Sequence, residues 1–412
     1  MRLAALLCLG VLVLSGCSGP NEPIRIGAVY PLTGSEDEGG VDELRGVQLA
    51  AQLVNEDGGV GGRPIRIVPI DVPAADAAPG AIGSLLDQGI DLVLGSYGST
   101  ISAPAAQAAA SRKMLFWETG AVGDMSDTGA GRFVFRVSPT GAVLGRSAIS
   151  FVAEQLAPML GRDATTLRFA VANVDDAYGR SVARGAVEEL RDRGLQVVGT
   201  FPYDAYDLDA AGLVRRLRVL HPDVVFVSAY LHDGVAIRRQ TVRQGLDLVA
   251  SIGTSSSYCL PMFGERLGTD ALGLFASDKP DAGLLNAGGL TPSARRLLTR
   301  ASAAYEDQHE EEMEAPALSG FAAAWALFHD VLPRAATLDA TGVGAAARGV
   351  RIPDGGLPNG SGLSFGAPGT ADAGANLRAA SVIWEWVRVG ERAVVWPPSF
   401  ATSEIRPIDI AP

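Results

Sequence analysis

Short apolar segments alternate with longer helical patterns along most of this chain, and this alternation constrains the fold more than any other feature. In the first part, residues 24–29, 65–70, 92–94 and 114–117 have the composition of buried strands. Helical patterns follow at 44–53, 74–87 and 102–111. Strands that alternate with helices of 10 to 15 residues favour a parallel sheet covered on both faces. The sequence therefore predicts a first α/β lobe.

A second series with the same order begins after Arg136–Gly141, where Pro139 and Gly141 indicate a crossing between lobes. A chain of 412 residues exceeds the roughly 250 to 300 residues at which one hydrophobic core stops growing. We therefore predict an α/β protein with two doubly wound parallel-sheet lobes. The predicted strands of the second series are 167–172, 196–201, 224–227 and 249–252, and its helices are 143–160, 179–193, 210–220 and 234–244.

The last third of the chain is less regular. Helical patterns at 293–307 and 320–335 return the chain to the first lobe in this interpretation. Residues 355–374 are rich in Gly and Pro, and residues 381–389 and 393–396 alternate like a terminal hairpin.

The N-terminus has the features of an export signal, with Arg2, an apolar run from Leu3 to Leu14, and small residues before Cys17. Leu14–Cys17 resembles the lipobox of bacterial lipoproteins, which implies cleavage after residue 16 and a lipid on Cys17. An ordinary cleaved signal with an incidental cysteine is the alternative. The expected location is extracytoplasmic, with the protein lipid-anchored to the bacterial cell membrane. Only Cys259 would then remain, so no internal disulfide can form.

Composition and motifs exclude several classes of function. The formal net charge of −12 makes nucleic acid a poor partner. The chain has no Walker loop or His-Glu-x-x-His motif and its four histidines are scattered, so we expect no enzyme and no cofactor. His309 with the three following glutamates is a possible metal site, but such a charged run is typical of a solvated helix end, so we expect no metal.

Ligands of doubly wound sheets bind beyond the carboxyl ends of the strands. In this chain those positions carry hydroxyls, glycines and aromatic rings, which suit a small polar ligand. The segments concerned are 30–34, 95–100 and 118–121 in the first lobe, and 175–179, 228–230 and 253–258 in the second.

Three elements of this predicted site each have an alternative interpretation. Gly95–Thr100, which leads into a helix, is either an anion seat at the helix start or a plain turn capped by Ser99 or Thr100. Tyr178 and Tyr230 are either walls of the cleft or ordinary core and rim aromatics. Glu118 either meets an ammonium, amidinium or hydroxyl group of the ligand or is a solvated or salt-bridged surface residue.

The ordered set of Ile26–Gly34, Gly46–Ile65 and Asp175–Gly179 resembles the leucine/isoleucine/valine-type periplasmic binding proteins, the type I clamps of ABC importers. The resemblance spans nearly the whole chain. It implies a Venus-flytrap fold with crossings near Ser138, Ser277 and Ile352, and ligand-driven closure of the lobes. The expected divisions are a signal peptide (1–16), a tether (17–23), lobe 1 (24–137 and 278–351) and lobe 2 (138–277 and 352–412).

Carried over by position, Ser99 and Thr100 match the family's hydroxyl pair for an amino acid's carboxylate, and Tyr178 and Tyr230 match residues that line the cleft. Two departures are Ala121, where the family usually has a threonine, and Ser255, where amino-acid binders often have an acid. These departures argue against a standard α-amino acid. The candidate ligand-binding residues are Tyr97, Ser99, Thr100, Glu118, Thr119, Gly120, Ala121, Tyr178, Tyr230 and Ser255.

The resulting hypothesis is a monomeric solute-binding lipoprotein that captures a small polar, amino-acid-like or amide ligand and delivers it to ABC permease subunits in the membrane. A ligand-sensing receptor lobe of the same fold, signalling to a partner protein, is the first alternative. An extracytoplasmic enzyme on the same scaffold is the second, and the lack of a recognisable nucleophile and base argues against it.

Overall fold

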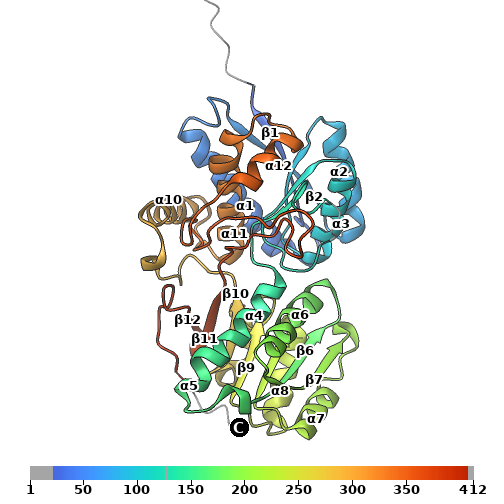
Figure 1. Ribbon diagram of the computed structural model, residues 1–412, viewed down its shortest axis with the longest axis vertical. Coiled ribbons are helices and arrows are strands. Elements are labelled where there is room, and N and C mark those ends of the chain that lie inside the picture. The colour runs from blue at the N-terminus through green and yellow to red at the C-terminus, as the bar shows by residue number, and fades with distance from the viewer. Residues whose placement is uncertain (1–21, 126–128, 407–412) are drawn as a thin grey trace, which may run out of the picture.

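Two lobes, each built around one β-sheet, lie end to end with a waist between them in the computed structural model, which describes residues 22–125 and 129–406 (Figure 1). The two-lobed α/β architecture predicted from the alternating pattern is confirmed. The predicted signal peptide, Cys17 and most of the tether lie outside the described residues.

The first-lobe sheet has five parallel strands in the order β2-β1-β3-β4-β5. Helices cover both of its faces (Figure 1). This explains why every residue of β3 and β4, in the middle of the sheet, is buried, since a parallel sheet is covered on both sides. The strands are β1 (Ile24–Tyr30), β2 (Ile65–Asp71), β3 (Leu92–Gly95), β4 (Leu115–Glu118) and β5 (Val134–Arg136). The helices are α1 (Asp37–Glu56), α2 (Ala78–Asp87), α3 (Ser99–Ser111), α10 (Pro292–His309), α11 (Ala315–Trp325) and α12 (Ala340–Gly349).

Helices α1 and α11 pack closely because each has a glycine at the contact. A Cβ atom on Gly46 would lie 2.0 Å from the carbonyl oxygen of Ala317, and one on Gly320 would lie 2.1 Å from that of Glu43. Among the described residues, one helical stretch, Ala315–Arg334, has the length and apolar composition to cross a membrane. Its most apolar window is 78 % buried inside the protein, as expected for a core helix.

The second-lobe sheet has seven strands in the order β12-β11-β10-β9-β8-β6-β7. Strands β6 to β10 run parallel, whereas β11 and β12 form the predicted terminal hairpin and run antiparallel at one edge. The strands are β6 (Arg168–Val174), β7 (Gln196–Tyr203), β8 (Val224–Ser228), β9 (Ala250–Thr254), β10 (Phe275–Asp278), β11 (Val382–Arg388) and β12 (Glu391–Trp396). The helices are α4 (Gly141–Phe151), which continues through a π-helical turn into α5 (Ala157–Met159), then α6 (Ala177–Asp192), α7 (Ala210–Leu220), α8 (Leu231–Arg243) and α9 (Pro261–Leu267).

The chain passes between the lobes after β5, after β10 and before β11. The third passage was expected near Ile352, and the structure corrects this position. Ile352 and Leu363 exchange backbone hydrogen bonds of 2.9 and 3.0 Å. The Arg136 N–H donates to the Gly374 carbonyl at 2.8 Å, and the rings of Phe365 and Trp117 lie 5.3 Å apart. Residues 352–376 therefore belong to the first lobe, because they extend the β5 edge and bury Phe365 in its core.

Candidate functional site

Both sheets share one local arrangement, in which the first strand of the lobe lies between the second and the third. The order is β2-β1-β3 in the first lobe and β7-β6-β8 in the second. Ligands of such sheets bind at the carboxyl ends of the strands, where the strand order reverses. In this chain those points are the ends of β1 and β3 and the ends of β6 and β8.

The starts of helices α3 and α6 bring the two lobes together at Gly123. A Cβ atom on Gly123 would lie 2.6 Å from Cβ of Ser99 in α3 and 3.2 Å from the carbonyl carbon of Ala177 in α6. An ion pair beside this point joins Asp124 in the first lobe to Arg184 of α6, with oxygen and nitrogen 2.7 Å apart. The segments that follow β3, β4 and β6 therefore form one region between the lobes.

Ser99 and Thr100 lie in the first turn of α3, which begins at Ser99, three residues before the predicted helix start at Ser102. Gly98 is the N-cap residue, so neither hydroxyl caps the helix in the way that the alternative interpretation proposed. The Gly123 N–H donates to Oγ of Ser99 at 2.9 Å, and Oγ1 of Thr100 donates to Oε1 of Glu36 at 2.9 Å. Both hydroxyls of the expected carboxylate seat are thus engaged by the protein itself.

Tyr97 packs its ring on α1, where a Cβ atom on Gly39 would lie 2.3 Å from the ring. Burial and then the charges of Glu43 and Asp278 raise the pKa of its hydroxyl. The hydroxyl of Tyr97 is therefore within electrostatic range of several carboxylates, among them Glu43 and Asp278.

Glu118 points into the first lobe, and this corrects both interpretations of it, as a ligand contact and as a surface residue. Its Oε1 accepts hydrogen bonds from the N–H groups of Gly120 at 2.7 Å and Ala121 at 2.6 Å, and its Oε2 accepts one from the Ser102 hydroxyl. Burial raises the pKa of Glu118 to about 7, although these hydrogen bonds oppose the rise. Glu118 shapes the turn after β4 and takes up the two N–H groups that this turn would offer to a ligand.

Thr119 also faces inward, and its partner Glu43 is a residue that the sequence analysis missed. Oγ1 of Thr119 donates to Oε1 of Glu43 at 2.5 Å and shares a hydrogen bond of 2.7 Å with the hydroxyl of Tyr30. The Gly120 carbonyl accepts a hydrogen bond of 3.0 Å from Nζ of Lys279, another missed residue. The only sequence signal for Glu43 was a carboxylate next to Leu44 on the apolar stripe of α1.

Burial raises the pKa of Glu43 to about 8, while the nearby charge of Lys279 opposes the rise. A Cβ atom on Gly120 would lie 1.8 Å from Oε2 of Glu43. The turn after β4 thus requires glycine at position 120 to make room for this carboxylate.

In the second lobe, Tyr178 is a buried core residue and Tyr230 is half-buried. The hydroxyl of Tyr178 shares a hydrogen bond of 2.6 Å with Oγ1 of Thr254, and its ring centroid lies 5.5 Å from that of Tyr230. The hydroxyl of Tyr230 donates to Oδ2 of Asp176 at 2.6 Å, and Asp176 also caps α6. Ser255 is half-buried in the turn after β9. Of this group, Tyr230 and Ser255 keep the exposure that a ligand contact needs.

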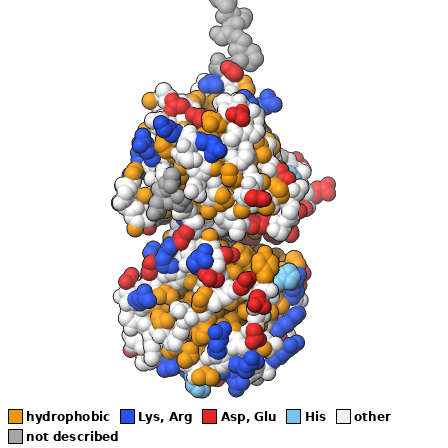
Figure 2. Space-filling view, turned by 90° about the vertical axis from the view of Figure 1, so that its right-hand side faces the viewer, with side chains coloured by type: hydrophobic (Ala, Val, Ile, Leu, Met, Phe, Trp, Pro, Cys, Tyr) orange, Lys and Arg blue, Asp and Glu red, His pale blue; other side chains and the backbone are white. Residues whose placement is uncertain are grey.

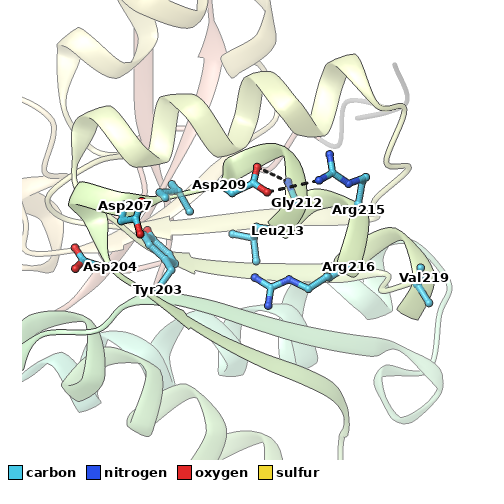
Figure 3. Close-up of a pocket in the computed structure, with 10 residues that line it drawn as sticks. Tyr203, Asp204, Asp207, Asp209, Gly212, Leu213, Arg215, Arg216 and Val219 are labelled. Carbon is cyan, nitrogen blue, oxygen red and sulfur yellow. Dashed lines mark hydrogen bonds and ion pairs between the residues drawn. The ribbon is translucent and has the colours of Figure 1, made fainter.

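Two surface pockets lie outside this set of residues. One, of 640 Å³, lies beside α7 and the end of β7, where Figure 3 shows Tyr203, Leu213 and Arg216 on its wall. The other, of 670 Å³, lies at the start of α1 and is lined by acids that include Glu38, Glu312 and Glu314. Neither pocket includes a predicted binding residue. In the described part of the chain, no group of three or more His, Cys, Asp or Glu side chains is arranged to hold a metal ion.

Comparisons with known proteins agree with this architecture. The family model described as "Periplasmic binding protein" matches residues 23–380, so the chain belongs to that family. A curated relative, Leu/Ile/Val-binding protein homolog 8 of Brucella suis, is 27 % identical over 414 residues, covering 98 % of this chain and 99 % of the relative. The resemblance to type I periplasmic binding proteins of the leucine/isoleucine/valine type is confirmed.

Two solved structures share the fold at low identity. A leucine-binding protein of Thermotoga maritima is similar with a TM-score of 0.72 at 19 % identity, covering 90 % of this chain and 97 % of that one. A solute-binding protein of Rhodopseudomonas palustris in complex with 3,4-dihydroxybenzoic acid has a TM-score of 0.68 at 18 % identity, covering 88 % and 93 % of the two chains. Because proteins with this fold bind chemically different solutes, the fold does not identify the ligand. Membership of the family implies an extracytoplasmic location.

Proposed function

We propose that this protein is the solute-binding component of an ABC importer, anchored outside the cytoplasm by a lipid on Cys17. It works as a monomer, captures a small polar solute between its lobes and presents the closed form to the permease subunits. A binding role without catalysis accords with the family, whose members are binding proteins.

The observation that carries this proposal is the meeting of α3 and α6 at Gly123. Two rigid lobes linked by three chain passages can open and close as a hinge, and hinge closure around a ligand is the usual mechanism of such clamps. The helix starts and strand ends that meet there come from both lobes, so a solute between them would contact both at once. Binding energy gained from both lobes then favours the closed form.

A thermal-shift screen of residues 18–412 against amino acids, short amides, polyamines, nucleosides and sugars tests the proposal. A solute that binds only the native state stabilises it by about 2.7 kcal/mol at 100 times its Kd. We expect one class of solute to raise the Tm, and small-angle X-ray scattering to show a smaller radius of gyration with that solute. If a stabilising solute leaves the radius unchanged, capture between the lobes is wrong.

A further inference from the structure

Glu36 covers the start of helix α3, where the family resemblance placed a ligand carboxylate. Its Oε1 accepts the hydrogen bond of Thr100 described above. Its Oε2 lies so close to Gly98 that a Cβ atom on this N-cap residue would overlap it, at 1.4 Å. Oε2 is buried and has no hydrogen-bond partner among the described residues. The positive end of the α3 dipole is thus already paired with a carboxylate of the protein.

A second carboxylate, Asp176, lies at the start of helix α6, which meets the start of α3 at Gly123. Asp176 caps α6 by accepting a hydrogen bond of 2.8 Å from the Gly179 N–H, and it also accepts the hydroxyl of Tyr230. Burial raises the pKa of Glu36, and the charge of Asp176 adds to this rise while the Thr100 hydrogen bond opposes it. Where the two lobes meet at Gly123, both helix starts are therefore occupied by acids.

Two buried carboxylates next to Tyr97 are incompletely paired. Glu43 is 0 % exposed and Asp278 is 6 % exposed, and each has one oxygen, Oε2 or Oδ1, without a hydrogen-bond partner in the described chain. The charges of both acids, together with those of Glu36 and Glu38, act on the hydroxyl of Tyr97. Burial raises the pKa of both Glu43 and Asp278; the charge of Lys279 opposes the rise at both carboxylates, and the charge of Arg392 also opposes it at Asp278.

The surface at the start of α1, which directly follows Glu36, is also acidic. The 670 Å³ pocket at the start of α1 is lined by five carboxylates besides Glu38 and by one arginine: Asp37, Asp42, Glu311, Glu312, Glu314 and Arg45. In the space-filling view, Asp and Glu side chains lie along the waist on both lobes, and Lys and Arg side chains lie among them on the second lobe (Figure 2). An acidic rim raises the local concentration of cations and repels anions.

We propose that the ligand presents a positively charged group, an ammonium, amidinium or guanidinium, to Glu36 and Asp176, and that Glu36 excludes ligands with a carboxylate at this position. The inference rests on the proposed solute-binding function and specifies its substrate class. A cation between the two carboxylates replaces their repulsion by two attractions as the lobes close. A carboxylate there would add a third negative charge and would have to displace Glu36 from Thr100.

The experiment measures the binding of matched probes by calorimetry. Leucinamide, leucine and 4-methylpentanoate share one side chain and carry a cation, a zwitterion and an anion, and agmatine and putrescine extend the cationic set. We expect at least one cationic probe to bind, and the substitution Glu36→Gln to weaken it at least tenfold. Glu36→Asp, which keeps the charge, should retain part of the affinity. Glu265→Gln, which removes an exposed carboxylate on α9, is the matched control and should leave binding unchanged.

Each other outcome is decisive. If a sugar, a nucleoside or an acid binds while every cationic probe fails, the solute-binding function stands and the cation inference is wrong. Equal affinity of a cationic probe for the wild type and for folded Glu36→Gln also overturns it. If no solute of any class binds, the proposed function falls, and this inference falls with it.

Discussion

Asp124 and Arg184 form an ion pair that ties the segment after β4 in the first lobe to helix α6 in the second. The two Arg184–Asp124 contacts measure 2.5 and 2.7 Å, and the Ser181 hydroxyl donates to the same carboxylate at 2.9 Å. Both charged side chains are about half exposed, so solvent limits the contribution of the pair to about 1 kcal/mol or less.

The first prediction concerns this ion pair. Arg184→Ala should shift the unliganded protein toward an open form, because it removes a contact that exists only when the lobes are together. Small-angle X-ray scattering should give a larger radius of gyration for the variant, and at high salt, where the pair is screened, the radius of the wild type should increase toward that of the variant. Arg180→Ala, in the same helix, removes an ion pair within the second lobe and should leave the radius unchanged.

The second prediction concerns the contact at Gly123. Gly123→Ala should weaken solute binding about tenfold or more without altering any group that could touch a solute. The added methyl would lie 2.6 Å from Cβ of Ser99 and 3.2 Å from Ala177, which forces the helix starts apart. Titration calorimetry with the solute found by thermal shift measures the effect.

A matched control is Gly80→Ala in the exposed part of α2, where a Cβ atom meets nothing within 4 Å. It should raise the stability by about 0.5–1 kcal/mol, as alanine favours helix over glycine, and should leave the affinity unchanged. Equal affinity of Gly123→Ala and the wild type would contradict the closed arrangement.

The third prediction is a pH dependence of stability from Glu43. In the folded protein, burial raises the pKa of the Glu43 carboxyl group to about 8, against an ordinary value of 4.5. Between these two pKa values the native state binds more protons than the unfolded state. The contribution of Glu43 to the free energy of unfolding is therefore complete below pH 4.5 and is lost as the pH rises through 8. The groups that face Glu43 are Lys279 and Glu118, whose charges act on it, the hydroxyl of Thr119, and the hydroxyls of Tyr30 and Tyr97, whose pKa values its charge raises.

Glu43→Gln should therefore flatten the decrease in Tm between pH 5 and 8.5. At the upper end of this range, the pH-dependent loss in the free energy of unfolding should differ between the two proteins by an amount on the order of a few kcal/mol. Thermal melts of both proteins across this range measure it. Glu118 also has a raised pKa, of about 7, so part of the decrease should remain in the variant. Parallel curves for wild type and variant would show that Glu43 is ionised in the folded protein.

The fourth prediction concerns the proposed anchor. Cys17→Ser should abolish incorporation of radiolabelled palmitate and should move the exported protein from the membrane fraction to the soluble fraction. Cys259→Ser, which changes the buried cysteine of the second lobe, should leave labelling and fractionation as in the wild type. Labelling that survives Cys17→Ser would show that the lipid is attached to another residue.

The periodicity of the sequence predicted most strands and helices to within a few residues. Helix α7 begins at Ala210 and ends at Leu220, as predicted. The sequence analysis missed α12, whose Gly-rich run Ala340–Gly349 resembles a loop in composition. It also missed the three-residue strand β5, of which only Arg136 lay in the predicted crossing. Short or glycine-rich elements form because neighbours in the folded protein stabilise them, and local periodicity does not record such neighbours.

The candidate site was harder to predict than the fold. All four residues of β4 are buried, so no alternation indicated that Glu118 would turn inward to Ser102. Glu36 lies over Gly98 although the two residues are more than sixty positions apart in the sequence. No spacing in the sequence predicts this contact. The boundary near Ile352 was wrong for a similar reason, because Phe365 reaches the first-lobe core through a loop without a regular pattern.

Neither lobe is a continuous stretch of the sequence, and this affects how an exported chain acquires its structure. Helix α1 needs α11, some 270 residues later, to cover its buried face, and the second-lobe sheet is completed by β11 and β12 near the end. A chain that emerges N-terminus first from a translocation channel therefore cannot close either core until almost all of it has crossed. A product truncated before β11 would expose apolar surface from an unfinished core, and proteases outside the cytoplasm could remove it.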